Sequence, residues 1–403
     1  MRIGIIGGSI AGCAAAALLG RGGHEVTVFE RSGSGLVSRG AGILMITSAW
    51  QDVLGRGLFD GGVPACQAGY SRFVTRDAGT GQSRWLGDIQ LDSTLFNWAH
   101  LHRSLRRGVP EGRYRDGVTV ERIEATAHGA TLHLAPGGAL DFDLAVCADG
   151  YRSLGRELID PGAAPAYRGI VLWRGLIPER DLGADPLGGC DLLRPMYPGG
   201  HGVVYYVPGP EDGTGPGERL LMWGYYLQVP ASELAAVLVN DQERRQSGSV
   251  PFGKVHPEVR AALESRLADL LPAPLFELVR RSGHSSIQAV YSYAARRYVR
   301  DRLCLLGDAG TLLPPFADSG VFRAVNSAAA LAGTLAGEPA VDDALRRWDD
   351  AQLQAAAQVA PNTEKVEQSY VFGMPDLAAL PVAAASDWLA AAFPGFPATL
   401  PRG

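Results

Sequence analysis

A glycine-rich turn near the start of the chain has the spacing of a phosphate site for a dinucleotide. It runs from Gly7 to Gly12 as Gly-Gly-Ser-Ile-Ala-Gly, and Ser9 stands where the GxGxxG pattern has its middle glycine. The first glycine permits a tight turn, the middle position admits a pyrophosphate, and the last lets a helix pack closely on a strand. The following helix N-terminus adds free N–H groups. We therefore expect Gly7, Ser9 and Gly12 to contact phosphates.

An acidic residue stands where the ribose of such a dinucleotide needs a hydrogen-bond acceptor. The β-rich segment 24–30 ends in Glu30, and Arg31 follows directly. In this type of fingerprint an acid about 20 residues after the turn accepts the ribose hydroxyls. Glu30 and Arg31 are therefore expected cofactor contacts, although the turn alone does not separate NAD, NADP and FAD.

Two more acids each follow an apolar run that is expected to form a buried strand. Asp149 follows 144–147 and Asp308 follows 302–306. In open α/β sheets, ligands bind at the carboxyl ends of the strands. We therefore expect both acids to lie at the ligand-binding edge.

The elements that must position these residues fall into two kinds. Segments 3–6, 10–19 and 24–30 predict a strand, a helix and a second strand, which form a βαβ unit. From about Gly169 onward, β-rich segments separated by Gly/Pro loops predict an antiparallel sheet. Further helices are expected at 97–107, 258–270, 323–335 and 341–360, a hairpin at 118–125 and 130–134, and a tail after Pro361 that packs along the surface.

Composition excludes several classes of protein. The net charge of −5 argues against a nucleic-acid binder. No apolar run approaches the roughly 18 to 20 residues of a membrane span. The five cysteines show no metal-binding spacing and predict reduced thiols, no metal site and a cytoplasmic protein. A homodimer is left open.

Together, the three motifs resemble the class A flavoprotein monooxygenases of the p-hydroxybenzoate hydroxylase fold. The second motif matches the family pattern DGxxSxxR from Asp149 to Arg156. The third keeps the family spacing from Gly307-Asp308 to Pro314-Pro315 and Gly320. The resemblance extends over about residues 1 to 350, and the glycine turn is most similar to members that act on hydroxylated pyridines.

The resemblance implies an α/β (α+β) fold, in which a Rossmann-like FAD-binding domain carries an inserted antiparallel-sheet substrate domain and a C-terminal helical segment. The implied boundaries are 1–75, 98–165 and 285–360 for the FAD-binding domain, 76–97 and 166–284 for the substrate domain, and 361–403 for the tail.

The resemblance also implies roles for residues outside the glycine turn. Asp308 would bind the FAD ribityl chain, and Asp149 would help to seat both FAD and NAD(P)H. The remaining implied cofactor contacts are Arg39 and Arg103 at the FAD phosphates, Pro315 beside the isoalloxazine, where we also count it as catalytic, and Gly320 in the following loop. Three positions depart from the family pattern and are expected to alter the pocket wall: Thr311, Phe322 and Asn326.

The implied activity is that of an FAD-dependent monooxygenase. It would use NAD(P)H and O2 to hydroxylate an aromatic or N-heteroaromatic small molecule through a flavin C4a-hydroperoxide. NAD(P)H would bind transiently, because the chain has only one dinucleotide fingerprint. Three alternatives remain: an alkene epoxidase on the same fold, an NAD-dependent dehydrogenase, and a non-catalytic flavin-binding protein.

Tyrosines in the β-rich region are the candidate substrate contacts. Because side chains alternate along a strand, Tyr205 is expected on one face of 203–207, and Met222 and Tyr226 on one face of 220–227. We expect Tyr205 and Tyr226 to be catalytic and to bind substrate together with Met222 and Met45. Three groups of alternatives are weighed against these: Tyr206 and Tyr225 on the opposite faces, sheet packing without function, and His201 or His284 as a base.

Overall fold

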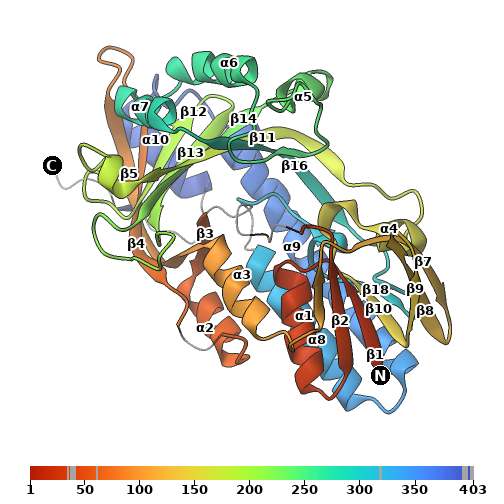
Figure 1. Cartoon of the computed structure of the whole chain (residues 1–403). Helices are drawn as coiled ribbons and strands as arrows, with labels where there is room; N and C mark the ends of the chain where they lie inside the picture. Colours follow the sequence, from red (N-terminus) through yellow and green to blue (C-terminus); the bar gives the residue numbers. More distant parts are fainter. Residues whose placement is uncertain (34–35, 37–41, 60–61, 317–319, 393–397, 400–403) are drawn as a thin grey trace.

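The structure is a computed structural model that describes residues 1–33, 36, 42–59, 62–316, 320–392 and 398–399. The expected cofactor contact Arg39 lies outside these described residues. The described helices and strands form two large sheets and one small sheet, with helices around and between them (Figure 1).

The first large sheet has the strand order β17-β18-β10-β1-β2-β6 and holds the glycine turn at its edge. All neighbouring strands are parallel except the pair β17–β18. The predicted opening βαβ unit is confirmed by β1, helix α1 and β2, and α1 packs against α3 and α8. The bounds are β1 Arg2–Ile6, α1 Ile10–Arg21, β2 Glu25–Glu30, α3 Trp98–Arg107, β6 Tyr114–Asp116, β10 Leu144–Cys147, β17 Val299–Arg300, β18 Leu303–Leu305 and α8 Gly320–Gly337.

The second large sheet is mostly antiparallel and has the strand order β15-β16-β11-β14-β13-β12-β4-β5-β20, with β3 paired to β5 and β19 to β16. Figure 1 shows it across the upper part of the molecule. Its strands are β3 Gly42–Ile46, β4 Ala65–Arg76, β5 Ser83–Asn97, β11 Ala166–Pro178, β12 Leu192–Tyr197, β13 Gly200–Val207, β14 Leu220–Gln228, β15 Ser249–Val250, β16 Ser285–Ala294, β19 Thr311–Leu312 and β20 Ala398–Thr399.

The hydrogen bonding of this sheet does not follow the predicted domain boundaries. Strand β4 pairs with β12 and β5, and β16 pairs with β11. The predicted boundaries at 75 and 285 assign both strands to the FAD-binding part. The sequence pattern shows that a strand is present but not which sheet it joins, and this is why the boundaries and the sheets differ.

Each face of the antiparallel sheet packs against different elements. Helices α5 Ala231–Val237, α6 Pro257–Ala268 and α7 Ala273–Arg281 lie along its outer face at the top of Figure 1. Their leucines pack there with Trp223 and Tyr225. The opposite face carries Tyr205, Met222 and Tyr226, so the predicted alternation along β13 and β14 is confirmed.

The remaining elements connect the two sheets. The expected hairpin is confirmed by β7 Thr119–Thr126 and β8 Gly129–Ala135, which form a small sheet with β9 Ala139–Phe142. The short helices between these strands are α2 Thr47–Gly55, η2 Gly150–Arg152, α4 Leu154–Ile159, η3 Glu179–Asp181 and η4 Gly307–Ala309.

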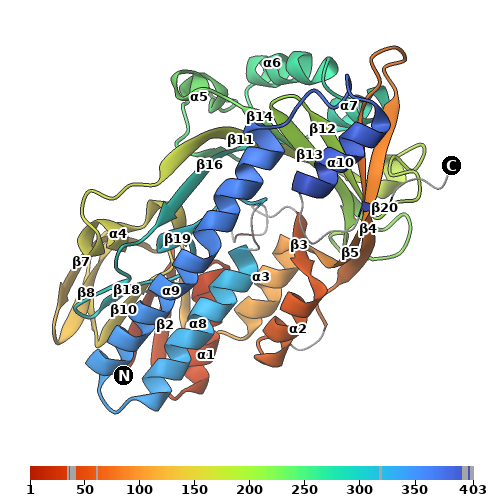
Figure 2. The same ribbon diagram turned by 180° about the vertical axis from the view of Figure 1, so that it is seen from behind.

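The C-terminal segment differs from the expected surface tail. Helix α9 Val341–Glu367 continues through Pro361 and leads into a π-helix, η5 Gln368–Phe372, and then into α10 Val382–Ala392. Figure 2 shows α9 running alongside α8 and on to the antiparallel sheet. Tyr370, Val371 and Leu389 are buried with Tyr226 in one hydrophobic cluster. The prediction of surface packing was wrong because these apolar side chains cover the inner face of the sheet.

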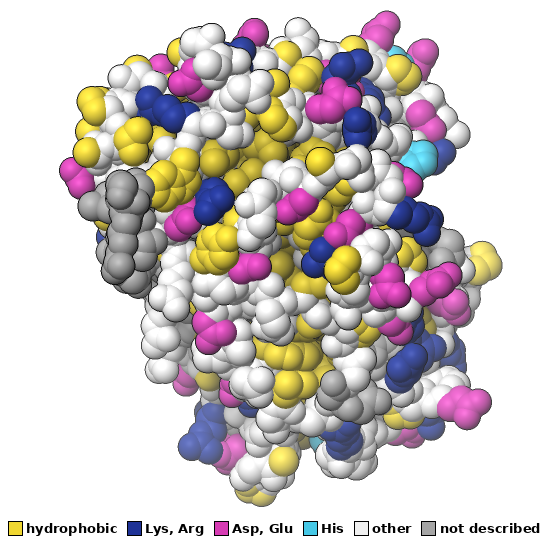
Figure 3. All heavy atoms as spheres, turned by 90° about the vertical axis from the view of Figure 1, so that its left-hand side faces the viewer, with side chains coloured by type: hydrophobic (Ala, Val, Ile, Leu, Met, Phe, Trp, Pro, Cys, Tyr) yellow, Lys and Arg dark blue, Asp and Glu magenta, His cyan; other side chains and the backbone are white. Residues whose placement is uncertain are grey.

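The face seen in Figure 3 carries no large patch of charges of one sign, because Lys and Arg side chains are interspersed there with Asp and Glu. In the described part of the chain, no helix combines the length and the apolar character needed to cross a membrane.

Candidate active site

Steric contacts explain the glycines of the opening turn. Gly7 has φ 97°, and a Cβ there would stand 2.4 Å from the carbonyl oxygen of Ala148. A Cβ on Gly12 would stand 1.9 Å from the carbonyl oxygen of Gly7. Ser9 is the N-cap of α1, but its side chain makes no capping hydrogen bond. The helix N-terminus and the Ser9 hydroxyl are therefore available to a phosphate.

The three motifs meet at the carboxyl ends of β1, β10 and β18. A Cβ on Gly7 would stand 2.9 Å from the Cα of Asp149, and a Cβ on Gly307 would stand 2.9 Å from the Cβ of Ala11. The expected approach of the glycine turn to the second and third motifs is therefore present in the fold.

Arg156 ties the second motif to the third. Its buried guanidinium donates to the carbonyl oxygens of Gly150 at 3.1 Å and Tyr151 at 2.6 Å, and to those of Asp308 at 3.3 Å and Ala309 at 3.1 Å. Burial lowers the pKa of Arg156, but a guanidinium stays charged in proteins. This explains the arginine that ends the DGxxSxxR pattern: it fixes both acid-bearing loops in place.

Both acids have unused hydrogen-bonding capacity. The Oδ2 of Asp149 accepts the Leu154 N–H at 2.8 Å, whereas its buried Oδ1 has no partner among the described residues. The Asp308 carboxylate lies 3.8 Å from the Arg323 guanidinium, and its side chain is 50% exposed. Loss of hydration within the protein raises the pKa of Asp308, and the positive charges of Arg323 and Arg156 oppose this shift. A ligand with hydroxyl donors would satisfy both carboxylates.

Glu30 and two unpredicted side chains fix the carbonyl and N–H of Gly8. The buried Glu30 carboxylate accepts the Gly8 N–H at 2.9 Å and the Ser32 N–H at 2.9 Å. His102 lies with its Nε2 2.9 Å from the Gly8 carbonyl oxygen, and Tyr114 donates to the same oxygen at 3.0 Å. No motif or spacing pointed to His102 or Tyr114, because both reach the turn only through the folded chain.

The predicted phosphate arginines do not all gather at the turn. Arg103 forms an ion pair with Asp212, a residue of the loop between β13 and β14. Arg31 is exposed directly after β2. Gly320 begins α8, and a Cβ there would stand 3.9 Å from the Asp308 carboxylate.

The inner face of the antiparallel sheet brings the expected substrate residues together. Tyr205 pairs with Met222 across β13 and β14, and Tyr226 lies on the same face. Tyr206 and Tyr225 point to the outer face, where no described residue hydrogen-bonds to the buried Tyr225 hydroxyl.

Met45 does not join this group. It is 1% exposed and packs in the main core with Trp50, whereas its neighbour Leu44 packs with Tyr205 and Met222. Along β3, the side chain that lies on the face with Tyr205 and Met222 is therefore that of Leu44 and not that of Met45.

An aromatic cluster links the sheet to the Pro314-Pro315 loop. Phe316, one residue after the exposed Pro315, packs edge-on against Tyr226 with ring centroids 5.1 Å apart. The His201 ring stacks on Tyr226 with centroids 4.6 Å apart and lies tilted against Tyr370 of the π-helix at 4.4 Å. Sequence reasoning missed Phe316 and Tyr370, because neither belongs to a motif or to the sheet.

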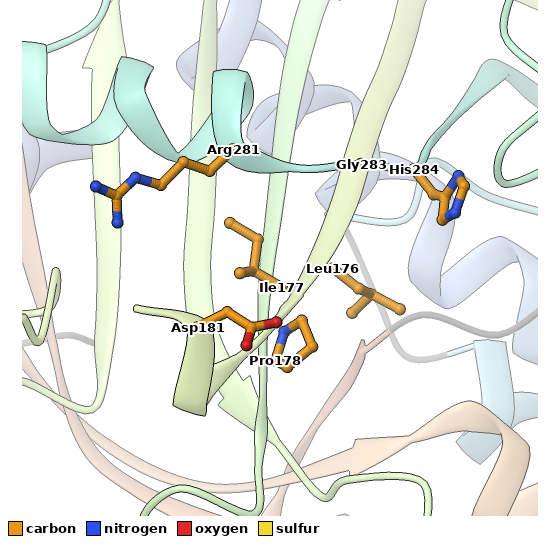
Figure 4. A pocket seen from close by; sticks show the side chains of 7 residues that line it. All are labelled: Leu176, Ile177, Pro178, Asp181, Arg281, Gly283 and His284. Atoms are coloured by element: carbon orange, nitrogen blue, oxygen red, sulfur yellow. The ribbon is translucent and has the colours of Figure 1, made fainter. Parts of the chain in front are cut away.

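The two histidines weighed as bases have different surroundings. His201 is completely buried; burial and the nearby Arg194 lower its pKa to about 3, so it is neutral at pH 7. His284 lies elsewhere, in a pocket of about 490 Å³ with Leu176, Asp181 and Arg281 (Figure 4). In the described part of the chain, no hydrogen bond or ring contact joins His284 to Tyr205 or Tyr226.

The motif region fits FAD. A dinucleotide presents a pyrophosphate and several hydroxyl donors. The uncapped start of α1 suits the pyrophosphate, and Glu30, Asp149 and Asp308 offer carboxylate acceptors to the hydroxyls.

Comparisons with known proteins agree with this assignment. A family model described as FAD binding domain-like matches residues 167–292. The 2,6-dihydroxypyridine 3-monooxygenase of Paenarthrobacter nicotinovorans is 25% identical over 357 residues, which cover 88% of this chain and 87% of that protein. The 3-amino-4-hydroxybenzoate 2-monooxygenase of Streptomyces cremeus is 28% identical over 392 residues, covering 93% and 89%.

Solved structures share the fold. The 2,6-dihydroxypyridine-3-hydroxylase of Arthrobacter nicotinovorans superimposes with a TM-score of 0.84 at 23% identity, covering 93% of each chain. A salicylate hydroxylase in complex with its substrate gives a TM-score of 0.71 at 18% identity, covering 96% of this chain and 93% of that one. The three motifs lie at one sheet edge, and along most of its length the chain is similar to class A FAD-dependent aromatic monooxygenases.

Proposed function

We propose that this protein hydroxylates a small aromatic or N-heteroaromatic compound, with FAD as cofactor, NAD(P)H as electron donor and O2 as co-substrate. The observation that carries the proposal is the meeting of the glycine turn with Asp149 and Asp308 at one edge of the parallel sheet. The relatives named for 2,6-dihydroxypyridine and 3-amino-4-hydroxybenzoate support a substrate of this class.

Bound FAD, once reduced by NAD(P)H, would supply the activation of O2, and the transferred oxygen atom would come from O2. The protein contributes binding, orientation and exclusion of water. The α1 N-terminus and Ser9 would hold the pyrophosphate, Glu30 the adenosine ribose, and Asp308 the ribityl chain. Arg156 keeps the loops of Asp149 and Asp308 in register through four carbonyl contacts.

The inner face of the antiparallel sheet would bind the substrate ring. Tyr226 and Phe316 offer an edge-on aromatic pair, which suits a flat ring. Burial raises the pKa of Tyr226 and of Tyr205 well above the usual range, so both phenols stay protonated and act as hydrogen-bond donors at neutral pH. In the described part of the chain, no group hydrogen-bonds to the Tyr226 hydroxyl, which leaves it for a substrate oxygen or nitrogen.

A panel of hydroxylated benzenes, benzoates and pyridines tests the proposal. Purified FAD-loaded protein should oxidise NADH or NADPH faster with at least one member, and that member should gain 16 Da. If NAD(P)H oxidation is stimulated but every compound yields only H2O2 and no hydroxylated product, the proposed hydroxylase function is wrong.

The same preparation separates the alternatives. A colourless protein that reduces or oxidises a substrate with NAD alone would be a dehydrogenase. A yellow protein that converts an alkene but no aromatic compound would be an epoxidase. A yellow protein inert to NAD(P)H would be a flavin-binding partner protein.

A further inference from the structure

A positively charged side chain of α8 turns back toward the carboxylate of Asp308. Arg323 is the fourth residue of this helix, which begins at Gly320. Helical side chains lean toward the N-terminus of their helix. A Cβ on Gly320 would stand 3.8 Å from Nη2 of Arg323 and 3.9 Å from Oδ1 of Asp308. The guanidinium and the carboxylate therefore meet at the start of α8.

Two contacts hold the guanidinium of Arg323 in this position. Its Nη1 donates to the carbonyl oxygen of Thr311 at 2.8 Å, and its Nη2 lies 3.8 Å from Oδ1 of Asp308. The side chain is 17% exposed, so water and salt screen its charge only in part. Arg323 therefore joins α8 to the loop of the third motif and places a positive charge beside the acid of that loop.

Arg156, the other cation that acts on Asp308, is engaged differently. Its guanidinium donates to four backbone carbonyl oxygens, and one of them is the carbonyl of Asp308 itself. Arg323 approaches the carboxylate instead, and it opposes the raised pKa of Asp308 more strongly than Arg156 does. Of the two cations, Arg323 is therefore the one beside the oxygens that a ligand of Asp308 would use.

The covalent structure of FAD would bring the charge of the reduced flavin to this place. Asp308 is expected to bind the ribityl chain, which is attached to the flavin at N10, and a single carbon atom separates N10 from N1. A hydride from NAD(P)H carries two electrons and one proton to the flavin, and the nicotinamide becomes a cation. The flavin thereby gains one negative charge, which its N1 and C2 carbonyl share.

This new negative charge would arise next to a carboxylate. Two negative charges in a partly dehydrated site repel each other, so Asp308 alone would oppose reduction of the flavin. A guanidinium 3.8 Å from the carboxylate offsets that repulsion and attracts the charged edge of the flavin. The position of Arg323 therefore matches the charge that develops on reduction.

We propose that Arg323 binds the N1 and C2 carbonyl edge of the flavin, stabilises its reduced form and so raises the reduction potential of bound FAD. Arg323 belongs to none of the three motifs, so it adds a residue to the cofactor site. This inference goes beyond the proposed function, because it rests on FAD binding and not on the aromatic substrate.

The reduction potential of bound FAD tests the proposal. Full-length FAD-loaded protein is reduced anaerobically with a reference dye of known potential and without any aromatic compound. Arg323→Gln removes the charge but keeps an N–H donor for the Thr311 carbonyl. We expect this variant to weaken binding of reduced FAD about tenfold more than that of oxidised FAD, which lowers the potential by about 30 mV for a two-electron couple.

Two further variants separate charge from structure. Arg323→Lys keeps the positive charge and should restore at least half of the difference in potential. Arg346→Gln is the matched control, because Arg346 is exposed on α9 and pairs with Asp343; it should leave the potential unchanged. Titration of each apoprotein with oxidised FAD should give Kd values within about threefold of wild type, since oxidised flavin carries no charge at this edge.

Three outcomes would overturn the inference. An unchanged potential in Arg323→Gln at saturating FAD would mean that the cation does not act on the reduced flavin. Equal falls in potential for the glutamine and lysine variants would assign the effect to the shape of the guanidinium and not to its charge. Loss of oxidised FAD from Arg323→Gln would make Arg323 a structural residue. None of these outcomes bears on hydroxylation, which the substrate panel tests separately.

Discussion

The Asp308 carboxylate has hydrogen-bonding capacity left for a ligand. Its side chain is half exposed, and the Arg323 guanidinium lies 3.8 Å away, which is too far for a hydrogen bond. Asp308→Ala should therefore weaken FAD binding about tenfold to a hundredfold, the loss of a charge-assisted hydrogen bond of about 1.5–3 kcal/mol. Titration of the apoprotein with FAD, followed by flavin fluorescence, gives the Kd. Asp350→Ala, at an exposed position on α9, is the control. Equal Kd values for the two variants would remove Asp308 from the cofactor site.

Tyr225 and Tyr226 form a matched pair on opposite faces of β14. Tyr226→Phe should keep FAD binding but lower the yield of hydroxylated product per NAD(P)H about tenfold or more, with H2O2 in its place, because a displacement of about 1 Å can cost on the order of 100-fold in rate. Tyr225→Phe should keep the coupling, since its buried hydroxyl forms no hydrogen bond with the part of the chain that the structure describes. Product and peroxide assays on both variants decide the point. The reverse pattern would place the substrate on the outer face.

At the residue scale, the sequence predicted contacts that belong to motifs or follow from strand alternation. Tyr205, Met222 and Tyr226 share a face as expected. His102 and Tyr114 contact Gly8 from far away in the chain, and Arg156 reaches from its own motif to the carbonyls of Asp308 and Ala309; no local pattern encodes these long-range contacts. Met45 stays a predicted substrate contact; its side chain packs in the main core, whereas that of Leu44 packs with Tyr205.

At the scale of elements, Asp160 connects helix α4 to strand β16. It accepts the Arg296 Nε–H at 2.9 Å and the Tyr293 hydroxyl at 3.0 Å. The hydrogen bond from Arg296 holds the pKa of Asp160 below its usual value, so this contact stabilises the fold above about pH 4 and is lost as the pH falls through the folded-state pKa. Asp160→Asn should lower the free energy of unfolding by about 1 kcal/mol at pH 7.

The prediction is checked by measuring how the stability difference between wild type and Asp160→Asn changes with pH. The gap in Tm between wild type and Asp160→Asn, taken at saturating FAD, should narrow below about pH 4. Asp343→Asn removes an exposed i,i+3 ion pair with Arg346 on α9 and should show almost no gap at any pH. A gap for Asp160→Asn that stays constant down to pH 3 would mean that the ion pair does not stabilise the fold.

Most elements could be predicted, but their partners could not. Apolar runs and glycine turns predicted the βαβ unit, the hairpin and the antiparallel strands. The sheet that β4 and β16 join depends on long-range pairing. The position of the C-terminal segment could not be predicted either. The apolar character of Tyr370 and Leu389 indicates that they are buried, but not which surface they cover.

At the scale of the whole molecule, FAD should join distant parts of the chain without a covalent bond. Its expected contacts come from the glycine turn, from Asp149 and from Asp308, three regions far apart in the sequence. A ligand that binds only the folded chain adds about 2.7 kcal/mol at a hundredfold excess over Kd, so FAD at that excess should raise Tm by about 3 °C. Heat or acid denaturation should then release all flavin as free FAD. Flavin that stays with the precipitated chain would contradict this prediction.

The central claim, that the protein transfers one oxygen atom from O2 to an aromatic ring, is tested most directly with isotope-labelled oxygen. FAD-loaded protein is supplied with NAD(P)H, the aromatic compound that best stimulates its oxidation, and 18O2 in unlabelled water. The mass of the product should rise by 18 Da, which is one labelled oxygen atom for each new hydroxyl group. A product labelled from H2 18O instead, or H2O2 with no hydroxylated product, would contradict the assignment as a monooxygenase.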